Sequence, residues 1–112
     1  MTIPATSLAA VTVDSANPGI GEAESLGAVF SKHGGYFTVE DWSGGSGSMS
    51  LMVEGSLDGT DWFTIVSTGT NANGQFHLAP TSEILALHIR ARAFVAIGAI
   101  SATVTGLIVS AA

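Results

Sequence analysis

Short runs in which apolar and polar residues alternate fill most of the sequence, and this period of two limits the fold more than any other feature. Residues 48–57 place Met49, Leu51 and Val53 at alternate positions, with mostly small or charged residues between them. Residues 85–93 repeat the pattern. Successive side chains of a β-strand point to opposite faces, so this alternation predicts half-buried strands rather than helices.

Turn-forming residues separate these runs. Glycine, asparagine, serine and proline are concentrated in residues 17–19, 43–47 and 71–74. Asp58 and Gly59 stand between two alternating runs, which is a strong hairpin signal. Short strands spaced by such turns are typical of antiparallel sandwiches and barrels. We predict an all-β chain that folds as a single antiparallel β-sandwich of about 7–8 strands.

An N-terminal segment precedes the predicted sandwich. Residues 14–25 are polar and contain Pro18 and two glycines, which predicts a loop between residues 1–13 and a sandwich of residues 26–112. Residues 1–13 are themselves strand-like, and we predict an N-terminal arm or swapped edge strand that pairs with its own sheet or with a neighbouring subunit's. Its apolar residues are expected to contribute to an interface: Ile3, Leu8, Val11 and Val13.

Charge is scarce for a chain of this length. Only 11% of the 112 residues are charged and 46% are hydrophobic, whereas ordinary soluble domains carry roughly 25% charged residues. This composition excludes a disordered chain. With 3 Lys and Arg against 9 Asp and Glu, and with no cysteine, it also argues against nucleic-acid binding and excludes a disulfide scaffold. Low charge of this kind suits a surface that neighbouring subunits cover.

The C-terminal residues 93–112 contain no charged residue, which raises the question of a membrane span. However, Ile100, Ala102 and Val104 fall on one parity, and serine and threonine residues fall on the other. We therefore expect a strand there and no membrane partner. Residues 1–10 lack the basic start and apolar middle of a secretory signal, so none is expected.

No pattern for catalysis or metal binding is present in the sequence. His33, His77 and His88 do not have the spacing of a zinc site, and each is expected on a solvent or interface face. Glu40 and Asp41 are neighbours on a predicted strand, so their carboxylates point to opposite faces and cannot flank one bond. A nucleophile motif and a phosphate-binding loop with its lysine are also absent. We expect no enzyme activity, no metal and no cofactor.

Two arginines and three aromatic residues are the binding candidates. Arg90 and Arg92 share one face of a predicted strand. There, their guanidinium groups could bind carboxylates of a neighbouring subunit or pair with an acidic residue of the same sheet. Tyr36, Trp42 and Trp62 would be the stacking platform of a glycan-binding protein, although core packing is the commoner role of aromatic residues in a sandwich.

Residues 53–65, with the sequence VEGSLDGTDWFTI, resemble the V-E-G-S-x-D-G-x-x-W-x-x-L hairpin of small β-sandwich structural proteins of tailed bacteriophages. Residues 87–92 and 104–108 are similar to the end of those proteins, where an arginine-bearing strand precedes a strand of small residues. The resemblance covers about residues 49–112. It implies a virion part, because the family includes capsid decoration proteins and head or tail accessory proteins.

The resemblance and the composition together lead us to expect a capsid decoration (cement) protein on the outer surface of the head, made in the cytoplasm of the bacterial host. It would bind the major capsid protein as a homotrimer, bridge capsomers and stabilise the shell, using the arm, Arg90 and Arg92. A negatively charged chain suits the outside of a shell, away from packaged DNA. The alternatives are a receptor- or glycan-binding module of a tail or head fibre, and a tail-tube or head–tail joining protein.

Overall fold

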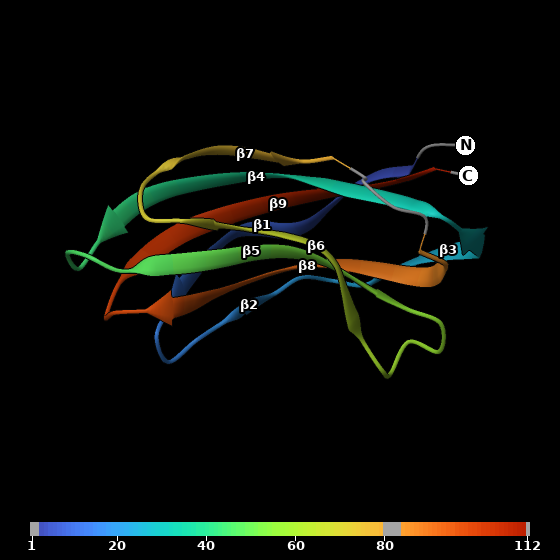
Figure 1. The fold of residues 1–112 in the computed structure, drawn as a ribbon, viewed down its shortest axis with the longest axis horizontal. Coiled ribbons are helices and arrows are strands. Elements are labelled where there is room, and N and C mark those ends of the chain that lie inside the picture. The colour runs from blue at the N-terminus through green and yellow to red at the C-terminus, as the bar shows by residue number, and fades with distance from the viewer. Residues whose placement is uncertain (1–2, 80–83, 112) are drawn as a thin grey trace.

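Two antiparallel β-sheets packed face to face form the computed structural model, which describes residues 3–79 and 84–111 (Figure 1). The four-stranded sheet has the order β1-β9-β4-β7, and the five-stranded sheet has the order β2-β8-β5-β6, with β3 also paired to β8. The strands are β1 (Ile3–Asp14), β2 (Gly19–Ile20), β3 (Glu24–Phe30), β4 (Lys32–Ser43), β5 (Ser48–Ser56), β6 (Phe63–Thr70), β7 (Gly74–Leu78), β8 (Ala86–Ile97) and β9 (Ser101–Ala111). The predicted class is confirmed, with nine strands where about 7–8 were expected. In the two described ranges, no helix is long and apolar enough to cross a membrane.

The N-terminal segment belongs to the four-stranded sheet of its own chain. β1 runs antiparallel to β9 from Ile3 to Asp14 with two register shifts, and Ala10 adopts a φ of 51° there. Residues 14–25, predicted as a loop, contain β2 and the start of β3, and both strands pair with β8. These short pairings cover one side of β8, whose backbone groups would otherwise form an open edge.

The uncharged tail, predicted as a strand, forms β9 inside the four-stranded sheet and contributes to the core between the sheets. Its Val104 is fully buried, as are Phe37 and Leu51 on the apolar parity of their strands. A Cβ atom at Gly106 would lie 2.9 Å from Cε2 of Phe37 and 3.0 Å from Cβ of Ala91. Small residues in the tail therefore make the space that the ring of Phe37 occupies.

The predicted turn at Asp58 joins β5 and β6 as an antiparallel hairpin. Oδ1 of Asp58 accepts hydrogen bonds from the backbone N–H groups of Asp61 and Thr60, both at 2.8 Å, and from the hydroxyl group of Ser56 at 3.0 Å. These bonds favour the charged carboxylate and lower the pKa of Asp58 to about 2. Gly59 has a φ of 79°, a left-handed conformation that glycine adopts without a steric cost.

Candidate functional site

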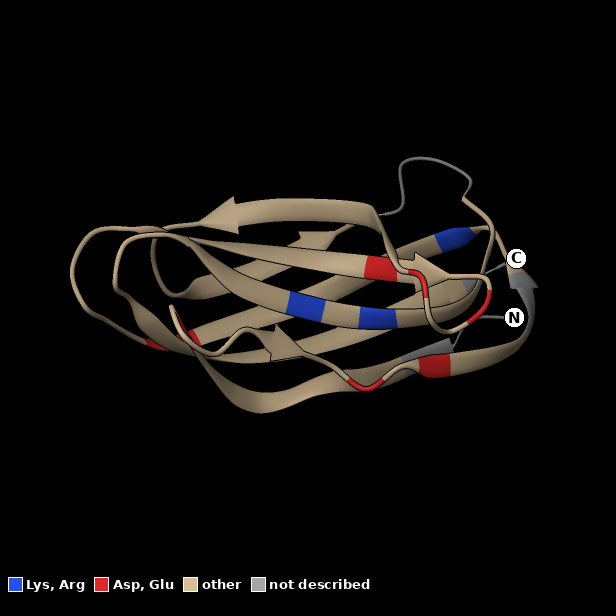
Figure 2. Ribbon diagram, turned by 90° about the horizontal axis from the view of Figure 1, so that it is seen from below, with Lys and Arg blue, Asp and Glu red and all other residues tan. Residues whose placement is uncertain are grey.

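The two arginines lie on β8, on the outer face of the five-stranded sheet, and both contact the carboxylate of Glu54. Figure 2 shows two basic positions close together on one strand of the ribbon. Glu54 on β5 pairs in register with Arg90 on β8, and Nε of Arg90 donates to Oε1 of Glu54 at 2.9 Å. Nη1 of Arg92 lies 3.5 Å from Oε2 of the same carboxylate. Glu54 is 5% exposed, so its charge is held by the two guanidinium groups rather than by bulk water. Of the two arrangements considered for the arginines, the structure shows the cross-strand pair within one sheet.

Aromatic rings extend this cluster in both directions. Cζ of Arg90 lies 4.1 Å from the centre of the Trp62 ring, and Cζ of Arg92 lies 5.1 Å from the centre of the Phe94 ring. Both distances are within the range of cation–π attraction. We call these five residues the arginine ladder: Trp62, Arg90, Glu54, Arg92 and Phe94. Guanidinium groups carry hydrogen-bond donors and no acceptor, so Arg90 and Arg92 can donate further hydrogen bonds to a partner but accept none.

The ladder has one unsatisfied donor. Nε of Arg92 is buried and has no hydrogen-bond partner among the residues that the structure describes. Glu54 also supplies one negative charge to two arginines, which leaves the ladder with a positive charge on a chain whose formal net charge is −6. The ladder is therefore a local electropositive spot on an acidic protein.

The outer face of the four-stranded sheet has the opposite character, because its central part carries no charge. Lys32 and Glu40 lie at the two ends of the outward row of β4, and the outward positions between them are uncharged. We call this surface the threonine face. Its outward residues are Thr6 and Thr12 of β1, Tyr36 and Thr38 of β4, Gln75 and His77 of β7, and Thr103, Thr105, Leu107 and Val109 of β9.

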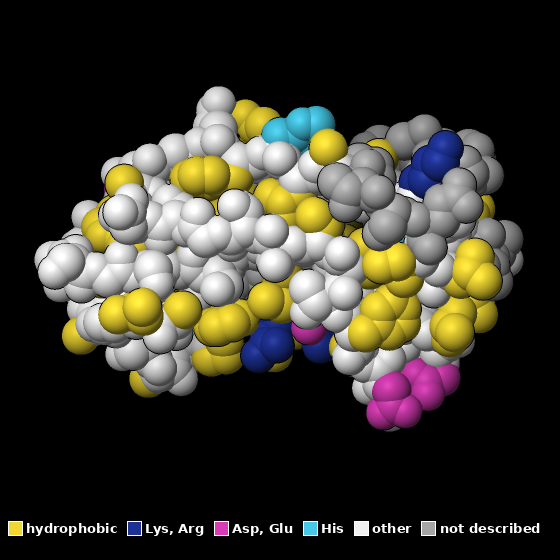
Figure 3. All heavy atoms as spheres, in the orientation of Figure 1, with side chains coloured by type: hydrophobic (Ala, Val, Ile, Leu, Met, Phe, Trp, Pro, Cys, Tyr) yellow, Lys and Arg dark blue, Asp and Glu magenta, His cyan; other side chains and the backbone are white. Residues whose placement is uncertain are grey.

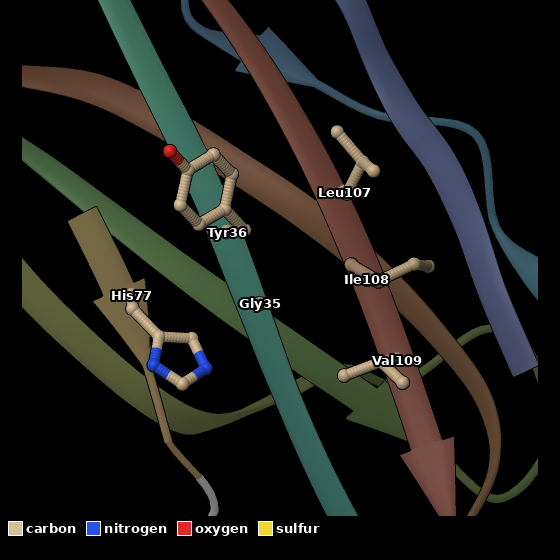
Figure 4. Close-up of a pocket in the computed structure, with 6 residues that line it drawn as sticks. All are labelled: Gly35, Tyr36, His77, Leu107, Ile108 and Val109. Carbon is tan, nitrogen blue, oxygen red and sulfur yellow. The ribbon is translucent and has the colours of Figure 1, made fainter. Parts of the chain in front are cut away.

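A shallow apolar hollow of about 150 Å³ lies on the threonine face (Figure 4). Tyr36 and Leu107 stand beside it and are 38% and 39% exposed, which is high for large side chains on inner strands of a sheet. Its lining consists of Gly35, Tyr36, His77, Leu107, Ile108 and Val109. The hollow can accept an apolar side chain of a partner, because covering it would desolvate no charged group.

The apolar residues predicted for the N-terminal arm lie on β1, in the other sheet from the arginine ladder. Leu8 and Val13 are buried in the core, and Val11 is half-buried and packs against it. Ile3 begins β1, and its side chain lies outside the described part of the structure. The side chains of Leu8 and Val13 therefore pack inside their own sandwich.

The three aromatic residues proposed for glycan stacking do not share a surface. Tyr36 lies on the threonine face, and Trp62 lies against Arg90 on the opposite sheet. Trp42 packs against the core near the end of β4, and its Nε1 donates to the carbonyl group of Gly45 at 3.4 Å. Each ring therefore has a different environment, and Tyr36 is the one beside the apolar hollow.

The prediction that His33 lies on a solvent or interface face is wrong. Its ring is 1% exposed, with Nδ1 2.6 Å from Oγ of Ser110 and Nε2 2.9 Å and 3.0 Å from the carbonyl oxygens of Phe30 and Ile84. Carbonyl groups only accept, so Nε2 carries the proton and the hydroxyl group of Ser110 donates to Nδ1. Burial lowers the pKa of His33, and the bonds to the two carbonyl groups oppose that effect. Within residues 3–79 and 84–111, no group of three or more His, Asp or Glu residues is arranged to hold a metal ion.

Two important features were not identified from the sequence. Glu54 was not recognised as the partner of the arginines, because the register between β5 and β8 cannot be read from either strand alone. Leu107 and Val109 fall on the otherwise polar parity of the tail, which runs through Ser101, Thr103 and Thr105. Leu107 and Val109, at alternate positions that otherwise carry polar residues, were the feature of the sequence that could have predicted an exposed apolar surface.

No protein-family model matches the sequence, and no curated protein matches it significantly. Among solved structures, the phage-derived PBSX exported protein XepA is similar over 98% of this chain and 37% of its own, with a TM-score of 0.70 and 17% identity. Infectious bursal disease virus VP2, solved as a subviral particle, is similar over 98% of this chain and 32% of its own, with a TM-score of 0.59 and 12% identity. Clostridium thermocellum xylanase 10B, solved as CBM22-1 and GH10 modules with xylohexaose, is similar over 99% of this chain and 26% of its own, with a TM-score of 0.53 and 12% identity. The chain therefore spans 26–37% of the length of these proteins, and the likeness shows a shared fold.

Proposed function

We propose that this chain is a structural protein of a bacteriophage virion and that it binds the outer surface of the head as a decoration protein. The threonine face is the observation that carries the proposal. It presents a sheet surface without central charges, with Tyr36 and Leu107 exposed beside an apolar hollow. Large side chains at the centre of an uncharged patch are typical of the residues that contribute most to protein–protein binding.

The distribution of charge supports a location on the outside of the head, with the threonine face toward the shell. The chain has a formal net charge of −6, and Asp58 and Asp61 are exposed at the tip of the β5–β6 hairpin. A negatively charged protein is repelled by DNA, so the outside of a filled head is the favourable location. The threonine face would then contact the major capsid protein, and the acidic hairpin would face the solvent.

The fold is compatible with a role in a particle. A sandwich of this kind occurs in the phage-derived protein XepA and in VP2 of a subviral particle, each within a longer chain. The proposed action is mechanical and involves no catalysis. Each copy would hold neighbouring capsomers together, and the small stabilisation from one contact would be repeated over the shell. The homotrimer, expected at three-fold positions of the shell, stays a prediction for copies bound to the head.

Binding to empty heads tests the proposal. Heads assembled from the major capsid protein of the same phage are incubated with increasing amounts of the purified chain, and the bound fraction is measured by gradient sedimentation. The wild-type chain should bind saturably. Leu107→Thr introduces a β-branched residue that suits a strand but removes apolar contact, and should weaken binding about tenfold, since burying a leucine side chain contributes about 1.5–3 kcal/mol.

Leu57→Thr is the matched control, because Leu57 is also an exposed leucine but lies in the β5–β6 loop, away from the threonine face. It should bind as the wild type does. Absence of saturable binding by the wild-type chain would refute the decoration role. Equal binding by the Leu107→Thr and wild-type chains would refute the threonine face as the contact.

The glycan-binding alternative has weaker support, because Tyr36, Trp42 and Trp62 lie in three separate environments. A glycan array separates the two functions. Saturable binding of one glycan, lost in Tyr36→Ala and combined with no binding to heads, would favour the glycan-binding module over the decoration protein. Ring-shaped oligomers at the head–tail junction would instead favour the joining protein.

A further inference from the structure

One long edge of the sandwich carries no charge at all. β6 and β7 are the end strands of the two sheets, and they lie along the same side of the molecule (Figure 1). From residue 63 to residue 79 the sequence contains no Asp, Glu, Lys or Arg. Figure 3 views this side, where hydrophobic side chains and white atoms of the backbone and uncharged side chains cover the central region, and charged side chains lie toward the margins. An uncharged edge is unusual because edge strands normally carry charges that prevent pairing with other chains.

β6 is the longer of these two edge strands and the less protected. It has eight residues against five in β7, and in the described ranges its only strand neighbour is β5. Its pairing with β5 has one register shift, next to Val66, and is regular from Val66 to Thr70. The outer side of β6 therefore presents unpaired backbone N–H and C=O groups on an uncharged strand whose register is regular from Val66 to Thr70.

The opposite edge of the sandwich is protected by several devices. β1 contains Pro4, two register shifts and the positive φ of Ala10. The loop after β2 also crosses it, where the backbone N–H of Glu22 donates to the carbonyl group of Ser7 at 2.9 Å. Prolines, bulges and covering loops all discourage strand addition, so the two edges differ in their capacity to pair with another chain.

We propose that β6 pairs antiparallel with β6 of a second copy of this chain, across a two-fold axis, so that the two five-stranded sheets become continuous. A second copy fits this edge because an antiparallel strand is its own complement under two-fold symmetry. Two copies with a net charge of −6 repel each other over most of their surfaces, and this edge is where approach brings no like charges together. Ser67 and Gly69 are exposed and small, so side chains on the two strands would not clash.

The contact differs from the one in the proposed function and does not rest on it. Binding to the major capsid protein uses the outer face of the four-stranded sheet, whereas the dimer uses the edge of the five-stranded sheet. The dimer should therefore form in the absence of heads, and its test uses the purified full chain alone.

Charges introduced on β6 test the pairing. In Ser67→Lys/Gly69→Lys, the lysines of two copies would face each other across the new strand pair, where like charges are destabilising. Both positions are exposed, and a Cβ atom at Gly69 meets only the carbonyl oxygen of Met49, at 3.8 Å, so the fold should tolerate the change. Sedimentation equilibrium should give a dimer for the wild-type chain and an increase of about tenfold or more in the dissociation constant for the variant.

Two further variants separate strand pairing from a general effect of charge. Thr6→Lys/Thr12→Lys adds the same charge at exposed positions of β1 on the opposite edge, and should remain a dimer. Ser67→Glu/Gly69→Glu should be monomeric alone but should form a heterodimer when mixed with the lysine variant, because opposite charges then face each other. A monomeric wild-type chain, or a dimer or trimer unaffected by the lysine pair in β6, would overturn the proposal. Failure of the mixed variants to associate would also overturn it.

Discussion

Removing the charge of Glu54 should destabilise the fold more than any other single loss of a carboxylate in this chain. Glu54→Gln keeps the size of the side chain and one acceptor oxygen, but it leaves Arg90 and Arg92 without a counter-charge. The two guanidinium groups lie on one face of β8, two residues apart, at 2.9 Å and 3.5 Å from the carboxylate oxygens in the wild-type structure. Their mutual repulsion is then no longer compensated.

The expected loss follows from the burial of the three side chains. Hydrogen bonds to charged groups contribute about 1.5–3 kcal/mol, and breaking a fully buried ion pair costs about 3–5 kcal/mol. The side chain of Glu54 is 6% exposed, but those of Arg90 and Arg92 are 20% and 36% exposed, so water screens part of the interaction. We therefore expect a decrease of about 2 kcal/mol in the free energy of unfolding, or about 8 °C in Tm for a chain of this size.

Urea unfolding followed by tryptophan fluorescence measures this loss, since Trp62 stacks on Arg90 and reports the state of the ladder. Glu40→Gln is the matched control, because Glu40 is an exposed carboxylate on a strand, and it should change stability by less than about 0.5 kcal/mol. In double-mutant cycles, Glu54 should couple more strongly to Arg90 than to Arg92, as the distances indicate. A Glu54→Gln variant as stable as the Glu40→Gln control would refute the energetic role of the ladder.

Two further predictions concern pH. Burial holds the pKa of His33 in the folded chain below its ordinary value of 6.5, so on acidification the unfolded chain takes up a proton at a higher pH than the folded chain. The contribution of His33 to the free energy of unfolding is therefore fully present above pH 6.5 and is lost as the pH falls from 6.5 through the lowered pKa of the folded chain. Urea unfolding at a series of pH values should show this loss in the wild-type chain and not in His33→Gln; a wild-type stability that is flat across this range would contradict the assignment. The pKa of Asp58, lowered to about 2, should likewise give stability that is lost as the pH falls from 3.8 to about 2. Carboxyl NMR titration measures that pKa directly, and Asp58→Asn should remove this acid dependence whereas Asp61→Asn should retain it.

The fold class could be predicted because its signals are local. Alternation with a period of two identifies a half-buried strand from the strand itself, and it distinguished the uncharged tail from a membrane helix. The turn at Asp58 and Gly59 was predictable for the same reason, since a hairpin turn depends on a few adjacent residues. The sequence by itself therefore determined the long alternating strands, their apolar faces and the hairpin between β5 and β6, but not β2 and the start of β3, which lie in residues predicted as a loop.

The tertiary structure decided which strands became neighbours. Glu54 lies opposite Arg90 because β5 pairs with β8 across 36 positions of sequence, and His33 is buried because Ser110, Phe30 and Ile84 surround its ring. The same non-local pairing placed residues 3–14 beside β9 and left β6 at an open edge. Strand order in an antiparallel sheet depends on contacts between distant segments, and no single segment contains the information that selects its partner.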